Sequence, residues 1–167
     1  MTLPASFPLS MSQISSELGL SVVFDWPLSI DNPLILALAG KTSLPVSFSD
    51  LLGQSGHVIS NGTVQQRGTF DYYVNLPSSS VFFSRSGGYI STLEETTSDQ
   101  NLLLTMTDPH PSFTGNIKVT NATLNRSLIL SYIGNGQWGG PSGGGVGGIG
   151  IFGHAGSTYT FTIYPAN

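Results

Sequence analysis

The chain has 167 residues, of which 39% are apolar and only 8% are charged, whereas a typical soluble domain carries about 25% charged residues. Five Lys and Arg residues against nine Asp and Glu residues give a net charge of −4, so we expect no nucleic-acid partner, because phosphate binding needs clustered cations. The lack of cysteine excludes disulfides, thiolate metal sites and cysteine nucleophiles.

The apolar runs of the sequence bear on membrane insertion and secretion. The longest run, residues 33–39, is far shorter than a membrane span, so no membrane insertion is expected. No basic region followed by an apolar stretch marks a secretion signal at the N-terminus. We therefore expect the chain to be made in the cytoplasm.

Residues 8–55 contain an internal echo. Residues 8–14 read PLSMSQI and residues 45–51 read PVSFSDL, with LSIDNPL at 28–34 between them. Each unit predicts a short helix that begins at a polar N-cap and stops at glycine. The expected N-caps are Ser12, Asp31 and Ser49, and the expected stops are Gly19, Gly40 and Gly53. Pro33 suits a first helical turn, where no N–H is needed.

Helices of six to eight residues are not stable alone and must pack on each other or on a partner. We interpret residues 1–56 as a docking module with short helices. The alternative is a small helical cap on the following β-domain. The apolar residues predicted to order the module and dock it on a partner are Met11, Ile14, Leu18, Leu34, Leu38, Phe48 and Leu51.

Residues 57–167 have the short alternating segments and turn residues of a β-domain. Their number predicts an antiparallel β-sandwich, immunoglobulin-like or jelly-roll in type, in a mainly β protein. The expected strands are 63–66, 68–74, 81–84, 89–93, 102–107, 115–120, 126–133 and 158–164.

A glycine-rich loop is predicted over residues 134–156, which hold 12 of the chain's 21 glycines. Unlike a plain linker, this run carries bulky apolar residues and is followed by a strand-like segment. Trp138 has glycine neighbours that offer it little packing. We therefore predict a ligand or interface contact through Trp138, Ile149 and Phe152.

No arrangement of residues in the sequence selects a catalytic or metal site. His57, His110 and His154 each sit beside Gly or Pro, which favours surface loops over metal ligands. No Gly-x-Ser-x-Gly elbow or phosphate-binding lysine motif is present. We predict a non-enzymatic protein with no catalytic residues, no metal and no cofactor.

Residues 7–55 resemble the N-terminal segment of short virion proteins of tailed bacteriophages, including tail-tip and tail-fibre proteins. The resemblance rests on three blocks in order: PLSMSQISSELG at 8–19, LSIDNP at 28–33 followed by LAG at 38–40, and VSFSDLLGQS at 46–55. Departures include the absence of Arg before LAG and the presence of Gln54, where the family has Lys. The resemblance implies a virion structural protein and says nothing about residues 56–167.

Together these observations predict a tail-tip, baseplate or fibre component that assembles with other virion proteins through its N-terminal segment. A homo-oligomer, most simply a trimer or a hexamer, is expected, because the polar β-surface carries so little charge. Two alternatives stay open. One is a capsid decoration (cement) protein, and the other is a module that recognises a host surface glycan through Trp138.

Overall fold

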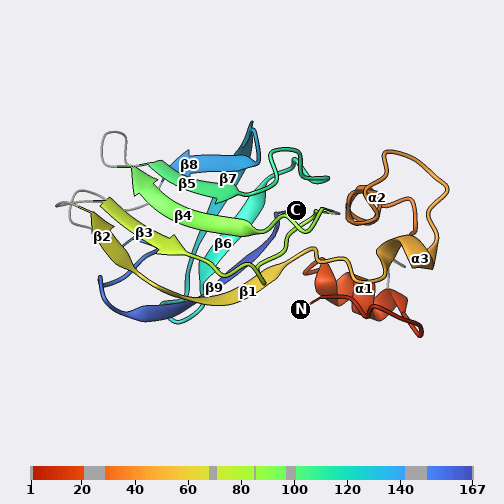
Figure 1. Cartoon of the computed structure of the whole chain (residues 1–167), viewed down its shortest axis with the longest axis horizontal. Helices are drawn as coiled ribbons and strands as arrows, with labels where there is room; N and C mark the ends of the chain where they lie inside the picture. The colour runs from red at the N-terminus through yellow and green to blue at the C-terminus, as the bar shows by residue number, and fades with distance from the viewer. Residues whose placement is uncertain are drawn as a thin grey trace.

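A computed structural model describes residues 2–20, 29–67, 71–84, 86–96, 101–141 and 150–166. The protein is mainly β, as predicted, with 39% strand and 12% helix. Three short helices lie at one end of the molecule and the strands fill the other (Figure 1). The helices are α1 (Met11–Glu17), α2 (Pro33–Leu38) and α3 (Phe48–Leu51).

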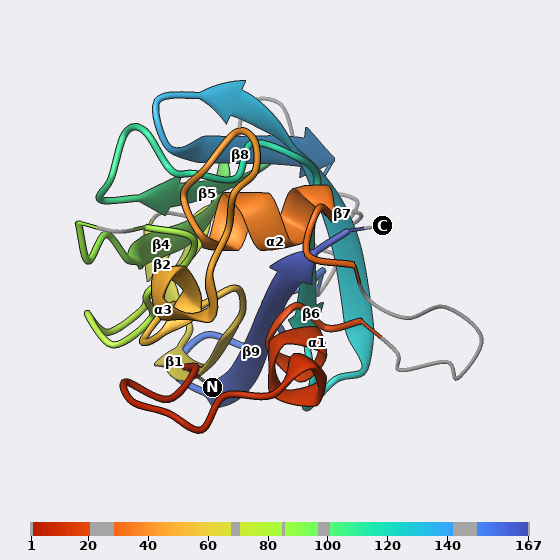
Figure 2. The same ribbon diagram turned by 90° about the vertical axis from the view of Figure 1, so that its right-hand side faces the viewer.

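The strands form one antiparallel sheet in the order β1-β9-β6-β7-β8-β5-β4-β3-β2. Seen from the helical end, this sheet curls into a nearly closed barrel (Figure 2). The strands are β1 (Val58–Thr63), β2 (Gln65–Arg67), β3 (Asp71–Asn75), β4 (Ile90–Thr96), β5 (Asn101–Met106), β6 (Ile117–Asn121), β7 (Arg126–Gly134), β8 (Gln137–Pro141) and β9 (Thr158–Pro165).

Several strand predictions need correction. Almost all of β1 was missed, because only its last residue, Thr63, falls in a predicted strand. The predicted strand at residues 81–84 contributes only a bridge between Val81 and Tyr89. β8 lies inside the run that was predicted to be a loop over residues 134–156. A tight turn joins it to β7, with Asn135 and Gly136 at φ 52° and 69°. Asn-Gly with both φ values positive is the usual two-residue hairpin turn.

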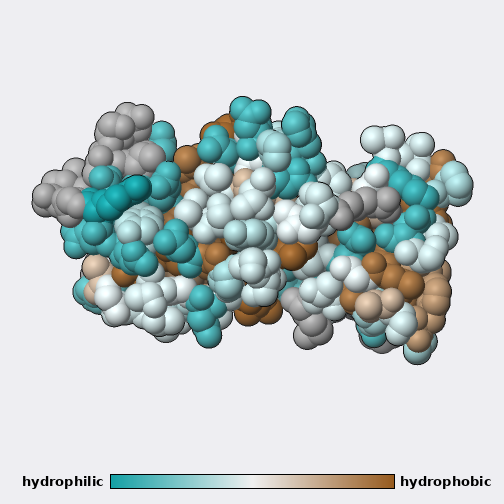
Figure 3. All heavy atoms as spheres, viewed as in Figure 1, coloured by the Kyte–Doolittle hydropathy of each residue, from teal (hydrophilic) through white to brown (hydrophobic). Residues whose placement is uncertain are grey.

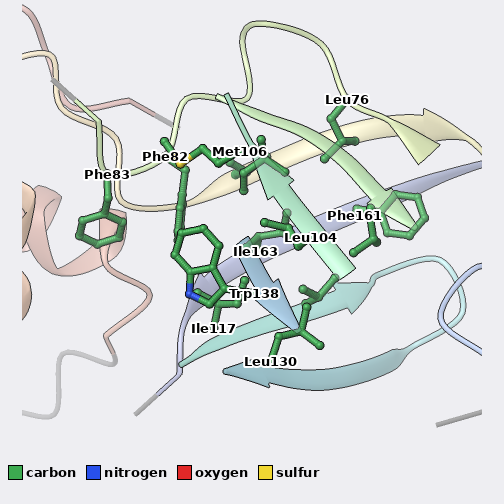
Figure 4. Close-up of a cluster of buried hydrophobic side chains, with 14 of the residues drawn as sticks. Leu76, Phe82, Phe83, Leu104, Met106, Ile117, Leu130, Trp138, Phe161 and Ile163 are labelled. Carbon is green, nitrogen blue, oxygen red and sulfur yellow. The ribbon is translucent and has the colours of Figure 1, made fainter. Parts of the chain in front are cut away.

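The core runs along the inside of the barrel. Inward side chains alternate along the strands, so that Leu102, Leu104 and Met106 of β5 are buried while Leu103 and Thr105 are half-buried on the outer face. Figure 4 shows Trp138 at the centre of this cluster, beside Phe82, Leu104 and Ile117. Phe82 and Trp138 meet edge to face, with ring centroids 6.0 Å apart. Such pairing adds to the burial energy of both rings.

The barrel closes where β1 lies against β3. Gly62 of β1 faces Val74 so closely that a Cβ at this position would overlap the valine side chain. A residue without a side chain is therefore needed for the two strands to approach. This contact brings β1, the first strand in the order, next to β3, the second strand from the other end.

Candidate docking surface

The observed helix N-caps lie two residues before, or one residue after, the N-caps predicted from the sequence. The observed N-caps are Ser10, Asn32 and Ser47, so the predictions of Ser12, Asp31 and Ser49 were wrong. The Asn32 side chain accepts from the backbone N–H of Leu34 at 2.9 Å. Pro33 is in the first turn of α2, as predicted. The predicted stops are confirmed by positive φ values at Gly19, Gly40 and Gly53.

The internal echo adopts the same local structure twice. In the first copy the Ser10 N–H donates to the Gln13 side chain at 2.7 Å. In the second the Ser47 N–H donates to the Asp50 carboxylate at 2.8 Å. In both copies the backbone N–H of the N-cap residue is thus satisfied by the side chain three positions on. A hydroxyl pair follows in each, Ser10 with Ser12 at 2.9 Å and Ser47 with Ser49 at 2.6 Å.

Lys41 stabilises the second copy of the echo, residues 45–51. Its Nζ donates to the Asp50 carboxylate at 2.7 Å and to the Pro45 carbonyl at 2.8 Å. The hydrogen bonds from Lys41 and from Ser47 hold the pKa of Asp50 well below its usual range. The carboxylate therefore stays charged, and the loop that leads into α3 is held at both ends.

Four of the predicted docking residues do not face outward. Ile14, Leu18, Leu38 and Leu51 are at most 1% exposed, so they form the internal packing of the helical end and the prediction that they contact a partner was wrong. Their spacing on short helices predicted burial correctly, but the partner they pack on is this chain itself. The other three, Met11, Leu34 and Phe48, are half-buried against the same cluster.

Among the described residues of this end, the large apolar side chains that are exposed are those of Phe7 and Leu44, neither of which was predicted to dock. Their side chains are 60% and 51% exposed. They occupy equivalent places in the two copies of the echo, each directly before the proline. Figure 3 shows apolar (brown) side chains gathered at this end of the molecule. We define the apolar tip as the three equivalent pairs Phe7 and Leu44, Leu9 and Val46, and Met11 and Phe48.

A signal for the tip was present in the sequence. In both copies, apolar residues alternate with Pro or Ser over five positions, at 7, 9 and 11 and at 44, 46 and 48. Alternation indicates an extended segment with one apolar face. Because the predicted unit begins at its proline, it omits the first and most exposed member of each series.

The helical end is attached to the barrel by a buried polar cluster that we call the joint: Glu17, Ser55, Gly56, His57 and Tyr164. The Glu17 side chain is only 3% exposed. Its Oε1 accepts from the Ser55 hydroxyl at 3.0 Å and from the Gly56 N–H at 2.9 Å. A carboxylate this deeply buried is tolerated only when hydrogen bonds replace its water.

The His57 ring completes the joint. Its Nδ1 lies 2.8 Å from the Glu17 carbonyl and 3.3 Å from the carboxylate, and the ring stacks on Tyr164 at 5.0 Å. Burial, together with the nearby Glu17 carboxylate, raises the pKa of Tyr164. The expectation that His57 lies in a surface loop was wrong, since the residue is 5% exposed and connects the end of α1 to the start of β1.

The predicted contact residues of the glycine-rich run lie elsewhere. Trp138 is 0% exposed and its Nε1 donates to the Gly115 carbonyl at 2.9 Å, so it cannot make the surface contact that was predicted. Phe152 is 2% exposed and stacks with Tyr72 at 6.4 Å, which makes it core as well. Ile149 lies outside the described residues. A glycan site built on Trp138 is therefore excluded.

The polar loop cluster around Asp108 is satisfied within itself. Its carboxylate accepts from the Ser84 and Ser86 hydroxyls at 2.5 and 3.0 Å and from the His110 N–H at 2.9 Å. These bonds, Ser84 foremost, lower the pKa of Asp108. No group of three or more His, Asp or Glu side chains suited to a metal ion is found in the described part of the chain.

Comparison with known protein families, with curated proteins and with solved structures finds no match. Among the described residues, no helix is long and apolar enough to cross a membrane.

Proposed function

We propose that the protein is a non-enzymatic structural component of a tailed-bacteriophage particle, attached to a neighbouring virion protein through the apolar tip. The class of particle comes from the resemblance of residues 7–55 to virion proteins. The proposed place of attachment is supported by the apolar side chains that the same segment exposes. The observation that carries the proposal is the paired exposure of Phe7 and Leu44 at equivalent positions of a repeated unit.

The two exposed side chains are large enough to matter for attachment. Full burial of a Phe or Leu side chain is worth about 1.5–3 kcal/mol. Because Phe7 and Leu44 are 60% and 51% exposed, covering both supplies roughly 1.5–3 kcal/mol in total. This corresponds to about one to two orders of magnitude in affinity. The half-buried members of the tip add partly exposed apolar side chains to each copy of the echo.

The remaining parts of the chain suit this arrangement. The capped helices and the joint hold the tip in a fixed position relative to the barrel, which lowers the ordering cost of attachment. In this proposal residues 1–56 act as the docking module and residues 57–167 project from the attachment point. The grouping of residues 57–167 with immunoglobulin-like or jelly-roll sandwiches remains a prediction.

Immunogold electron microscopy of purified particles, with antibody raised against residues 57–167, tests the proposal. Label at the tail end is the expected result and supports a tail-tip, baseplate or fibre component. Label spread over the head would support capsid decoration instead, with the same docking surface. Particles that carry neither label nor peptides of this chain by mass spectrometry would contradict the proposal.

A further inference from the structure

The two copies of the echo, taken with the residue before each proline (residues 7–14 and 44–51), match in conformation and in exposure. The N-cap Ser10 has φ −115° and ψ 157°, and its equivalent Ser47 has φ −110° and ψ 159°. Position by position, seven of the eight pairs of residues have the same degree of exposure. The exception is Asp50, which forms an ion pair within its own loop and is less exposed than its equivalent. The two copies therefore present similar surfaces.

Folding explains only part of this repetition. Ile14 and Leu51, the last residues of the two copies, are 0% exposed and pack inside the helical end. Phe7 and Leu44, the first residues, have no such role, because each side chain is more than half exposed. Exposed side chains contribute little to stability, so folding does not require a large apolar residue at this place in both copies. Contact with a partner is a reason for it that applies to both copies alike.

The two copies are held together and face the same end of the molecule. The Leu3 N–H donates to the Gln54 carbonyl at 2.9 Å, and the Gly53 N–H donates to the Pro4 carbonyl at 2.9 Å. These bonds join the segment before the first copy to the segment after the second. Figures 1 and 2 show the segments that lead into α1 and α3 at the end farthest from the barrel. Two contacts made by one ordered body strengthen each other at little further ordering cost.

The charge of the two copies indicates the chemistry of the partner. Residues 2–14 contain no charged side chain. Residues 42–51 contain one, Asp50, which is paired with Lys41 at 2.7 Å. A charged partner surface would lose its hydration against these segments without gaining a counter-charge. The matching surface is therefore apolar and uncharged, with room for a Phe or a Leu side chain.

We infer that the neighbouring virion protein presents the same apolar, uncharged pocket twice, and that one copy of the echo occupies each pocket. A protein presents one pocket twice where two of its subunits meet in a symmetric assembly, or where its own chain contains a repeat. The inference rests on the proposed function, since it names the kind of partner that the apolar tip fits. The two pockets are equivalent, so each accepts Phe or Leu at the same place.

Photocrosslinking tests the equivalence of the pockets. p-Benzoylphenylalanine replaces Phe7 in one protein, Leu44 in a second and Ile59 in a third, a control on the barrel whose side chain is 53% exposed. Particles that contain each protein are irradiated, and mass spectrometry identifies the cross-linked peptides. We expect positions 7 and 44 to give the same partner peptide, or equivalent peptides of an internal repeat, and position 59 to give neither.

Exchange of the two side chains is a second test. Phe7→Leu combined with Leu44→Phe should leave the number of copies per particle close to the wild-type value, because equivalent pockets accept either residue. Phe7→Ser and Leu44→Ser should each lower that number, by similar factors of about three to ten. Thermal unfolding of every variant checks that it is folded.

The outcomes separate this inference from the proposed function. Unrelated partner peptides at positions 7 and 44, or an exchanged variant that attaches as poorly as the serine variants, would overturn the inference alone. Attachment through the apolar tip would then stand, with two different contacts. If neither position gives a partner peptide and both serine variants attach at wild-type copy number, the proposed function is overturned together with the inference.

Discussion

The barrel and the helical end are stabilised by different means. The barrel surrounds large buried rings, including Trp138, Phe82 and Phe161, which are 0% exposed. The helical end has helices of seven, six and four residues, too short to be stable alone. Its order rests on buried side chains such as Leu18 and Leu51, on side chains that cap the helices and on the polar joint to the barrel. The comparison teaches that apolar burial organises the barrel, whereas the helical end needs capping and buried polar hydrogen bonds in addition to its apolar burial.

Within the helical end, the side chains that pack its interior differ from those that remain exposed to a partner. The helical end buries Ile14, Leu18 and Leu51 for its own packing and still exposes Phe7 and Leu44. Side chains that a region leaves exposed contribute little to its stability, which makes their replacement the cleanest probe of a docking role.

Replacing Trp138 with Ala should destabilise the protein most. The change removes the central ring of the barrel, and such substitutions cost about 3–5 kcal/mol. Urea unfolding followed by circular dichroism measures the loss. Trp138→Phe serves as the control and should cost less, although it leaves the Gly115 carbonyl without its donor. An unchanged unfolding midpoint for Trp138→Ala would show that the ring is not part of the core.

Glu17→Ala should loosen the helical end without loosening the barrel. The change leaves the Gly56 N–H without its buried acceptor, a loss that costs about 1–3 kcal/mol, whereas the Ser55 hydroxyl keeps the His57 carbonyl as an acceptor. Hydrogen exchange should speed up in α1 and remain slow in β5 and β8. Glu17→Gln, which keeps one acceptor oxygen, should lie between. Equal acceleration in both regions would remove the distinction between them.

Gly62→Ala should strain the place where the barrel closes. The new methyl group would overlap Val74, and overpacking of this kind costs about 1–3 kcal/mol. Combining it with Val74→Ala should recover part of the loss, because the smaller partner leaves room. A double variant that loses as much as the sum of the two single variants would show that the side chains do not meet.

Asp108 should contribute to stability in a defined pH window. Its pKa is lowered from 3.8 in the folded protein, so its contribution is fully present above about pH 4 and is lost as the pH falls through the folded pKa. Ser84→Ala removes the main donor and should raise the folded pKa toward the ordinary value. Carbon-detected NMR titration of the Asp108 carboxyl measures both. An identical pKa in the two proteins would rule out the Ser84 hydrogen bond as the cause.

The sequence predicted the strands with clear alternation best. Residues 158–164 and 126–133 fall within β9 and β7, because one face of each strand is buried. β8 was missed because glycine frequency was read as evidence for a loop, although Asn135-Gly136 is a hairpin signal. Trp138 was then interpreted as exposed. Neighbouring glycines do not decide burial, since the rings around Trp138 come from β7 and from the loop before β4.

The candidate site was predicted in its location but not in its residues. Short helices in the N-terminal third followed from the caps and glycines, yet the side chains chosen for docking were the ones that the fold buries. The joint was not foreseen, because Glu17 and His57 are 40 residues apart and no local pattern connects them. Only the folded chain brings the end of α1 to the first strand.

The most direct test of the docking surface combines Phe7→Ser with Leu44→Ser. Because both side chains are exposed, the unfolding free energy should change by less than about 0.5 kcal/mol per site. Quantitative mass spectrometry then counts copies of the chain in particles assembled with the variant. We predict at least a tenfold loss of copies with an unchanged unfolding midpoint. Wild-type copy numbers with the folded variant would contradict the account, because attachment would then not depend on the apolar tip.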